Sequence, residues 1–166
     1  MCRLWWLSLL ACVAAAGSAG AATTSSTFGV SVNLQSACSA TAGDIAFGAY
    51  TPGRGARNAN TTIRVKCTRN TAFTVSLNAG TTTGANLAQR LMASGPNTLQ
   101  YNLYTNGART IVFGDGTGAT ATRSGVGNGL GAARIVNVFG RLPDTAFNRA
   151  AVPGNYRDSI TVTISY

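Results

Sequence analysis

The sequence predicts an antiparallel β-sandwich, and three observations support this fold class. Apolar and polar residues alternate over several short segments, as expected for strands with one buried and one exposed face. Turn-forming residues separate these segments, and no long stretch shows helical periodicity. Many short strands of this kind pack as two sheets around one core.

The N-terminal residues 1–21 have the features of a secretory signal peptide. A short basic start ending at Arg3 precedes an apolar run over 4–13, and small residues lead to Ala19–Ala21, where cleavage is expected. A lipoprotein signal stays open as an alternative, because Leu9–Cys12 resembles a lipobox. No later segment holds the roughly 18 consecutive apolar residues that a spanning helix needs, so no stable membrane span is expected.

Removal of this leader leaves two cysteines, Cys38 and Cys67. An even pair in an exported chain favours a disulfide. Two buried free thiols, or a metal site lacking its other ligands, are the alternatives. The chain has no histidine that would complete a zinc site, and no cofactor is expected.

Alternating segments stand at both ends of the mature chain, over 28–35 and 159–166. A strand at a free terminus can pair within its own domain or with a neighbouring molecule. The apolar positions are Phe28, Val30, Val32 and Leu34 in the first segment, and Ile160, Val162, Ile164 and Tyr166 in the last.

The remaining elements are expected in order between these ends. Asn106-Gly107 predicts a hairpin between two strands, the Gly-rich stretch 114–131 a long mobile surface loop, and 87–92 a helical turn. The expected inner strands are 62–68, 72–78 and 99–104, with shorter candidates at 44–47, 109–113 and 134–139.

The net charge indicates which kinds of partner the chain could bind. The formal charge is +9, and loss of Arg3 with the leader leaves +8. Such a charge could steer the protein to anionic polymers. The arginines are scattered from Arg54 to Arg157 without interleaved aromatic residues, so a solvated positive surface is favoured and no nucleic-acid partner is expected.

Catalytic groups are few, and the chain is not expected to be an enzyme. Without histidine, neither a Ser–His nor a Cys–His nucleophile can be built. Lys66 falls on the exposed face of an alternating strand, and the Gly-rich stretch after Phe113 lacks the lysine of a phosphate-binding loop. Turn, cap or ion-pair roles are expected for the four acidic residues, Asp44, Asp115, Asp144 and Asp158.

A series of short motifs in a fixed order carries more information than any one of them. The motifs are Cys38, 45–50 (IAFGAY), 65–68 (VKCT), 90–92 (RLM), 99–104 (LQYNLY), 113–116 (FGDG), 138–143 (VFGRLP) and 154–162 (GNYRDSITV). This series resembles the spore coat protein U domain family, which includes subunits of archaic (Csu-type) chaperone–usher pili. Phe113 departs from the pattern, because many relatives have tryptophan there.

The resemblance implies an incomplete immunoglobulin-like sandwich that lacks its final strand. In such pilins a periplasmic chaperone fills the open groove, and an outer-membrane usher replaces it with the N-terminal strand of the next subunit. Carried over, residues 22–36 form the donor segment, with Phe28, Val30, Val32 and Leu34 as donor residues. Residues 37–166 form the pilin-like domain, and Ile160, Val162 and Ile164 line its acceptor groove.

The resemblance therefore predicts a structural pilus (fimbrial) subunit, secreted through the periplasm to the cell surface, that supports adhesion and biofilm formation. One alternative is a spore or cell-surface coat protein assembled in a similar way. Another is a secreted polyanion-binding module, which needs a clustered arginine or aromatic site that the sequence does not display. It also stays open that 28–35 is the first strand of a self-contained sandwich.

Overall fold

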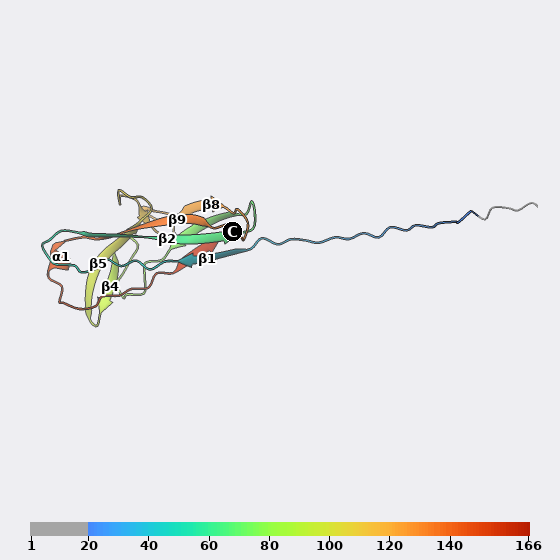
Figure 1. The fold of residues 1–166 in the computed structure, drawn as a ribbon. Helices are drawn as coiled ribbons and strands as arrows, with labels where there is room; N and C mark the ends of the chain where they lie inside the picture. Colours follow the sequence, from blue (N-terminus) through green and yellow to red (C-terminus); the bar gives the residue numbers. More distant parts are fainter. Residues whose placement is uncertain (1–19) are drawn as a thin grey trace, which may run out of the picture. The chain divides into compact units, whose positions relative to one another are not determined.

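The computed structural model describes residues 20–166 of the chain, which falls into two units, 1–33 and 34–166. Apart from its last two residues, the predicted signal peptide lies outside the described residues. Residues 20–37 have no regular secondary structure. The second unit is built almost entirely of β-strands and one short helix, as the sequence predicts (Figure 1).

The strands of the second unit form two antiparallel layers, with one parallel pair. The larger sheet has the order β1-β2-β9-β5-β6-β7 with β4 paired to β5, and the smaller has the order β10-β3-β8. The parallel pair is β6 with β7. The elements are β1 Cys38–Ala42, β2 Arg57–Cys67, β3 Ala72–Leu77, β4 Arg90–Ser94, β5 Asn97–Tyr104, β6 Val112–Phe113, β7 Thr120–Ala121, β8 Arg123–Val126, β9 Arg134–Leu142, α1 Ala146–Arg149 and β10 Val162–Ser165.

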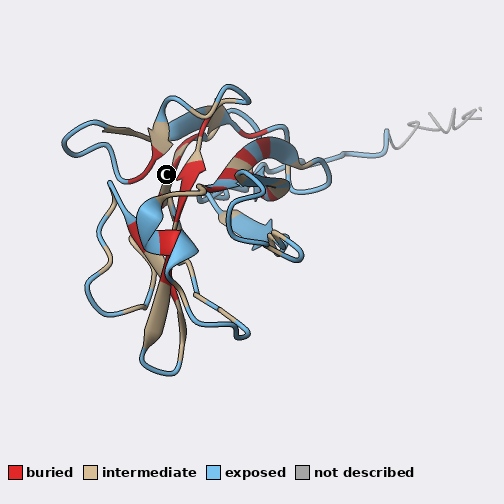
Figure 2. Ribbon diagram, turned by 90° about the vertical axis from the view of Figure 1, so that its left-hand side faces the viewer, coloured by how far each residue is buried: buried red, intermediate tan, exposed pale blue. Residues whose placement is uncertain are grey.

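The core lies between the two layers and consists of alternate residues of the long strands. Buried and exposed residues follow one another along these strands, visible as coloured bands in Figure 2. This alternation is the period of two from which the fold class was predicted, and it is confirmed. The buried apolar side chains are Ile63, Val65, Cys67, Phe73, Val75, Leu77, Met92, Leu99, Tyr101, Leu103, Phe113, Val136, Val138 and Leu142.

Several expected strands are confirmed, with shifted ends. The strands expected at 62–68, 72–78, 99–104 and 134–139 correspond to β2, β3, β5 and β9. Asn106 lies in the turn that joins the antiparallel strands β5 and β6, where its carbonyl accepts the amide of Arg109 (3.0 Å). Only Val112–Phe113 of the expected 109–113 strand is paired, because the turn extends further than Asn106-Gly107.

Other expectations are wrong. Residues 44–47 form no strand, since the described chain gives their backbone no partner, and 28–35 forms no strand with its own domain, whereas its pairing with a neighbouring molecule stays a prediction. The stretch 114–131 contains β7 and β8 and is not a plain loop. Residues 87–92 do not form a helical turn, because Arg90–Ser94 pairs with β5 as β4. Pairing with the next strand, in a tight hairpin in which Ser94 stands opposite Asn97, outweighed the weak helical preference of this segment.

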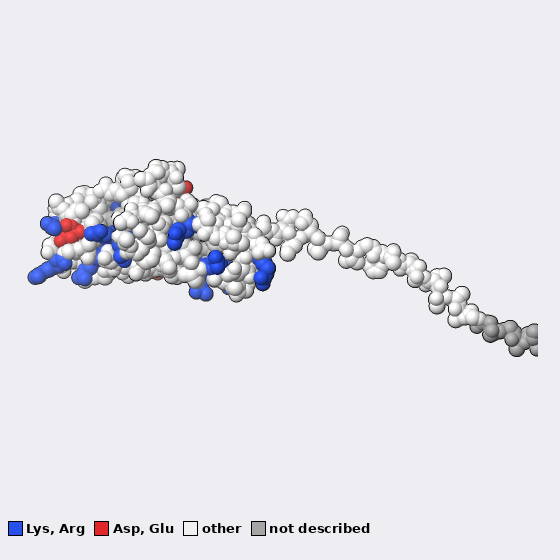
Figure 3. Space-filling view, turned by 90° about the horizontal axis from the view of Figure 1, so that it is seen from above, with Lys and Arg blue, Asp and Glu red and all other residues white. Residues whose placement is uncertain are grey.

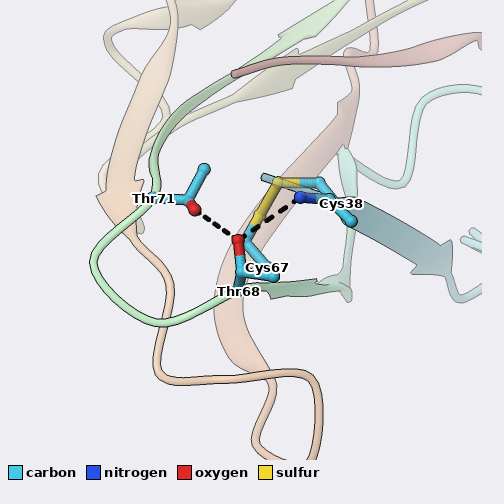
Figure 4. The surroundings of a disulfide bond; sticks show 5 residues. Cys38, Cys67, Thr68 and Thr71 are labelled. Atoms are coloured by element: carbon cyan, nitrogen blue, oxygen red, sulfur yellow. Dashed lines mark hydrogen bonds between the residues drawn. A yellow bond between two sulfur atoms is a disulfide. The ribbon is translucent and has the colours of Figure 1, made fainter. Parts of the chain in front are cut away.

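A disulfide joins Cys38 to Cys67. The two residues stand directly opposite each other at one end of the β1–β2 ladder. Next to them the Thr68 hydroxyl accepts the amide of Ala37 (3.3 Å) and pairs with the hydroxyl of Thr71 (Figure 4). The disulfide that the sequence predicts is therefore present, and it fastens β1 to its single neighbour β2. We call this the disulfide end of the domain.

We expect Cys38→Ser to lower the free energy of unfolding by about 3–4 kcal/mol, because the bond closes a loop of 29 residues in the unfolded chain. Urea unfolding with and without reductant measures this loss. Reductant should destabilise the wild type to the level of the variant and leave the variant unchanged. Two titratable thiols in the denatured, non-reduced wild type would contradict the bond.

Candidate strand-acceptor seam

Two edge strands face each other without being joined. β1 pairs only with β2, and β10 only with β3, among the strands that the structure describes. Some Cα atoms of β1 and β10 nevertheless lie within 8 Å of one another, and Figure 1 shows the red C-terminal strand beside β1. Each edge presents unpaired backbone amides and carbonyls, which are costly to leave without partners. The sandwich is therefore not closed along this side.

Core-facing side chains along β1 are uncovered. Ala40 stands opposite Val65 and Ala42 opposite Ile63, so both alanines point to the face that carries the core. Val65 and Ile63 are 0% and 1% exposed, whereas both alanines are exposed. A complete sandwich would cover these inward positions.

The same holds for β10 on the other border. Val162 stands opposite Leu77 and Ile164 opposite Val75, which places both on the core face. Their partners are fully buried, but Val162, Ile164 and the preceding Ile160 are only half-buried against the core. We call the surface formed by these residues with Ala40, Ala42, Ile45 and Phe47 the open seam.

The segment that follows β1 leaves the sheet edge and crosses the inner face of β9. An added Cβ on Gly140 of β9 would lie 2.5 Å from the Cδ1 atom of Ile45 and 3.0 Å from the ring of Phe47, so a larger residue here would force these two side chains to shift. The Phe47 ring packs edge-on against Tyr101, with centroids 6.0 Å apart. Within the described part of the chain, residues 44–50 make no backbone–backbone hydrogen bond.

A partly buried polar cluster fixes the segment that leads into β10. The Tyr101 hydroxyl donates to the carboxylate of Asp158 (2.6 Å), whose other oxygen accepts the amides and hydroxyls of Thr81 and Thr82. Burial and this hydrogen bond raise the pKa of Tyr101 far above its ordinary value. Asp158 is therefore a structural acceptor at the base of the open seam.

Arg90 extends this cluster and is fully buried. Its guanidinium donates to the carbonyls of Asn78 (3.0 and 2.7 Å) and Phe113 (2.8 Å) and to the side-chain oxygen of Asn102 (2.6 Å). Burial lowers the pKa of Arg90. The Asn78 amide donates to the carbonyl of Thr161, and the Thr161 amide donates to the side-chain oxygen of Asn78. Through Asn78, Arg90 is therefore connected to the chain just before β10.

A second cluster fixes the end of the crossing segment on the other border. Asp144 accepts the hydroxyl of Tyr50 (2.6 Å) and the amides of Gly53 and Gly55 (3.1 Å each), and it pairs with Arg149 (3.2 Å). The hydrogen bond from Tyr50 holds the pKa of Asp144 well below its usual range. Burial, followed by the same bond, raises the pKa of Tyr50 to about 12.

The structure brings the expected acceptor residues together, whereas the expected donor residues stay in the sequence-distant, exposed N-terminal segment. Ile160, Val162 and Ile164 share one border of the open seam, and their role as acceptors remains a prediction. The expected donor side chains are strongly exposed, at 88% for Phe28, 86% for Val30, 93% for Val32 and 84% for Leu34. The sequence reasoning missed Ala40, Ala42, Ile45 and Phe47, although the period of two in 45–47 was a usable signal.

Three of the four aspartates serve the fold. Besides Asp144 and Asp158, Asp115 accepts the amide and hydroxyl of Thr117 and closes a turn. Between residues 20 and 166 no cluster of His, Cys, Asp or Glu side chains has the size of a metal site, and no helix is long and apolar enough to cross a membrane. Asp115, Asp144 and Asp158 thus fix turns or loops of the fold, whereas the expected role of Asp44 is not seen, since its side chain makes no hydrogen bond or ion pair with another described residue.

Two depressions lie away from the open seam. One of about 490 Å³ lies over Phe73 between β3 and β8, and one of about 330 Å³ lies between β8 and the start of β9. Their walls are formed by small residues such as Ser124 and Gly125 together with apolar side chains such as Phe73, and Arg134 is the one charged residue that lines them. They contain no grouping of nucleophile, acid and base, so the open seam is the stronger candidate for a functional site.

The fold and its unclosed edge define an incomplete immunoglobulin-like β-sandwich. The Spore Coat Protein U domain model matches residues 24–163, and the chain belongs to this family. No curated protein sequence matches the chain.

A solved structure shares the fold. It is the CsuC–CsuE chaperone–tip adhesion subunit pre-assembly complex from archaic chaperone–usher Csu pili of Acinetobacter baumannii. The TM-score is 0.55 at 24% sequence identity, over 80% of this chain and 40% of that chain. The present chain therefore spans less than half of the chain it matches.

We expect Gly140→Val to destabilise the domain by about 1–3 kcal/mol, because its side chain would displace Ile45 and Phe47 from β9. Urea unfolding measures the loss. Gly131→Val is the matched control, since an added Cβ there meets open space. Equal effects of the two substitutions would mean that the crossing segment does not pack as described.

We expect the stabilisation by Asp144 to depend on pH. Because the folded pKa of this carboxyl lies below its unfolded value of about 3.9, its contribution is complete above that value and is lost as the pH falls toward the folded pKa. Asp144→Asn should therefore lower stability at neutral pH, and its difference from the wild type should shrink in acid. Urea unfolding across pH tests this, with the exposed Asp44→Asn as control; a difference that grows on acidification would contradict it.

Proposed function

We propose that this protein is a structural subunit of a chaperone–usher pilus and polymerises by donor-strand exchange. The observation that carries the proposal is that one chain contains both a seam of uncovered core-facing residues and a separate, exposed segment of alternating apolar residues. An added strand would pair with the free edges of β1 and β10 and cover the core between them.

The spacing of apolar side chains in the donor segment agrees with their spacing along the open seam. The side chains of Phe28, Val30, Val32 and Leu34 recur every second residue, which is about 7 Å along an extended chain. Ile160, Val162 and Ile164 recur at the same interval along the seam. A donor strand in register would therefore place an apolar side chain beside each uncovered inward position.

The direction of the donor follows from strand polarity. β1 runs away from the disulfide end, and β10, antiparallel to β3, runs toward it. The donor segment leaves its own domain at the disulfide end, where Thr68 donates its amide to the carbonyl of Ala37 (2.9 Å). If the donor lies antiparallel to β10 of a neighbour, its last residues reach the neighbour's far end, and subunits repeat head to tail.

The opposite direction would bring two disulfide ends together and close the assembly as a pair. A fibre therefore requires the donor to run antiparallel to β10. Only Gln35 and Ser36 separate the last donor residue, Leu34, from the anchored Ala37, so neighbouring domains would lie close to one another.

An uncovered seam also implies partners before assembly. We infer that a periplasmic chaperone covers the seam until an outer-membrane usher exchanges it for the donor segment of the next subunit. The resulting surface fibre would support adhesion and biofilm formation. A coat protein assembled by the same exchange is the second candidate, because the matching family model carries the spore coat description.

We expect deletion of residues 23–35 to abolish polymerisation while leaving a subunit that still binds its chaperone. Electron microscopy of the cell surface and of purified protein measures fibre formation. Fibres would distinguish a pilus subunit from an amorphous coat. Fibres formed by the deletion variant would rule out assembly through this segment.

A matched pair of substitutions tests the donor face itself. Val32→Asp should block assembly, because it would bury a charge in the seam, whereas the neighbouring Ser31→Asp should be tolerated on the outer face. Both variants should keep the stability of the wild-type domain, since residue 32 is exposed in the free chain. Equal assembly of the two variants would contradict an alternating donor strand.

A further inference from the structure

The connector between the donor segment and β1 is very short. Leu34 is the last apolar donor residue, and Gln35, Ser36 and Ala37 join it to Cys38, the first residue of β1. β1 runs away from the disulfide end, so a donor segment that entered the open seam of its own domain would have to reverse at the connector and lie antiparallel to β1. The connector therefore bears on whether the segment fills its own seam or that of another molecule.

Ala37 is already held beside β2. Its carbonyl accepts the amide of Thr68 (2.9 Å), and its amide donates to the Thr68 hydroxyl (3.3 Å). Because backbone groups point alternately to the two sides of a strand, every second residue after Ala37 has its amide and carbonyl on the free edge of β1. These residues are Cys38, Ala40 and Ala42. A strand that pairs with this edge must bond through them.

An added strand must also turn its apolar face to the core. Cys38, Ala40 and Ala42 carry their side chains on the core face, and residues directly opposite each other in an antiparallel pair share a face. An apolar donor residue must therefore stand opposite one of them. A shift by one residue would turn Ser31 and Asn33 toward the core instead.

With β1 intact, all the apolar donor side chains can enter the open seam of their own domain only if Leu34 stands opposite Cys38. The loop between these two residues would then be the three-residue connector, and a hairpin loop of this length ends with a residue in the left-handed region. That residue is Ala37, which has no positive φ and whose amide and carbonyl are bound to Thr68. A shift by two residues, with Val32 opposite Cys38, avoids this conflict but leaves Leu34 in the loop, outside the seam.

Two strand reversals within the domain show what the connector lacks. β4 turns into β5 through a loop that begins with Gly95 (φ 58°), between the paired residues Ser94 and Asn97. The turn from β5 to β6 contains Arg109 with a φ of 57°. The connector, residues 35–37, contains neither glycine nor asparagine, which adopt this left-handed conformation most readily. Its residues do not favour a tight reversal.

Neither charge nor side-chain chemistry distinguishes the seam of the same chain from that of a second copy. Residues 20–37 contain no charged side chain, and the described part of the N-terminal segment is white in Figure 3. The two seams are lined by the same residues, because the copies have the same sequence. A preference between them must therefore come from the covalent connection, which constrains the donor segment only toward its own domain.

We propose that the connector of Gln35, Ser36 and Ala37 is a specificity determinant of strand exchange, which keeps the donor segment out of the open seam of its own chain and leaves it for a second copy. This inference rests on the proposed function. A neighbour's seam requires no reversing loop, since a donor antiparallel to β10 runs parallel to β1 there. All the apolar donor side chains can then be used, including that of Leu34.

Insertion of Asn-Gly between Ser36 and Ala37 tests the proposal. The added residues form tight turns, so Leu34 could stand opposite Cys38 while Ala37 keeps its bonds to Thr68. Insertion of Thr-Val at the same place is the matched control. It adds the same length, but β-branched residues disfavour the left-handed region.

Hydrogen exchange of the full exported chain, oxidised and in dilute solution, measures insertion within one molecule. The Asn-Gly insertion should slow exchange of the amides of residues 28–34 at least about tenfold, independently of protein concentration, relative to the wild type and the Thr-Val variant. Val32→Asp added to the Asn-Gly variant should remove this protection. Protection of these amides in the dilute wild-type chain, or equal exchange in the two insertion variants, would overturn the proposal.

Electron microscopy of fibres separates this inference from the proposed function. The Thr-Val variant should still form fibres, whereas the Asn-Gly variant should form at least about tenfold fewer, because its own donor segment occupies its seam. Equal fibre formation by the two variants would overturn the role of the connector. Absence of fibres from the wild-type chain would instead contradict the proposed function, and the exchange measurement in dilute solution does not depend on that result.

Discussion

The structure depends on the lack of a strand partner between β1 and β10. Two backbone edges and several core-facing side chains are left without cover at one place, so the domain has a strong physical reason to accept an extended segment. The disulfide fits this constraint, because it fastens an edge strand whose other side is unpaired and cannot contribute hydrogen bonds. The disulfide thus holds β1 on β2, while the other side of β1 stays accessible along the open seam.

Polar clusters keep both borders of the seam in place without help from the missing strand. Asp158 and the buried Arg90 fix the chain before β10, and Asp144 fixes the loop that follows the crossing segment. Hydrogen bonds of this kind specify position better than apolar contacts, which tolerate sliding. A seam with fixed borders would need less rearrangement on entry of a strand, which is consistent with the proposed exchange.

Part of the fold and of the candidate site could be predicted from the order of residues. The alternation in 159–166 identified the wall residues Ile160, Val162 and Ile164, and the paired cysteines identified the disulfide. The fourth strand escaped prediction, because Arg90 reads as a surface residue until the carbonyls that surround it are known.

The sequence by itself determined where apolar and polar residues alternate, and therefore the long strands β2, β3, β5 and β9, the sandwich and the apolar face of residues 28–34. It could not determine which alternating faces are covered. That was decided by the tertiary structure, because coverage depends on the register of β1 on β2 and of β10 on β3. An inward-pointing Ala40 or Val162 stays uncovered only because no described strand of its own domain lies over it.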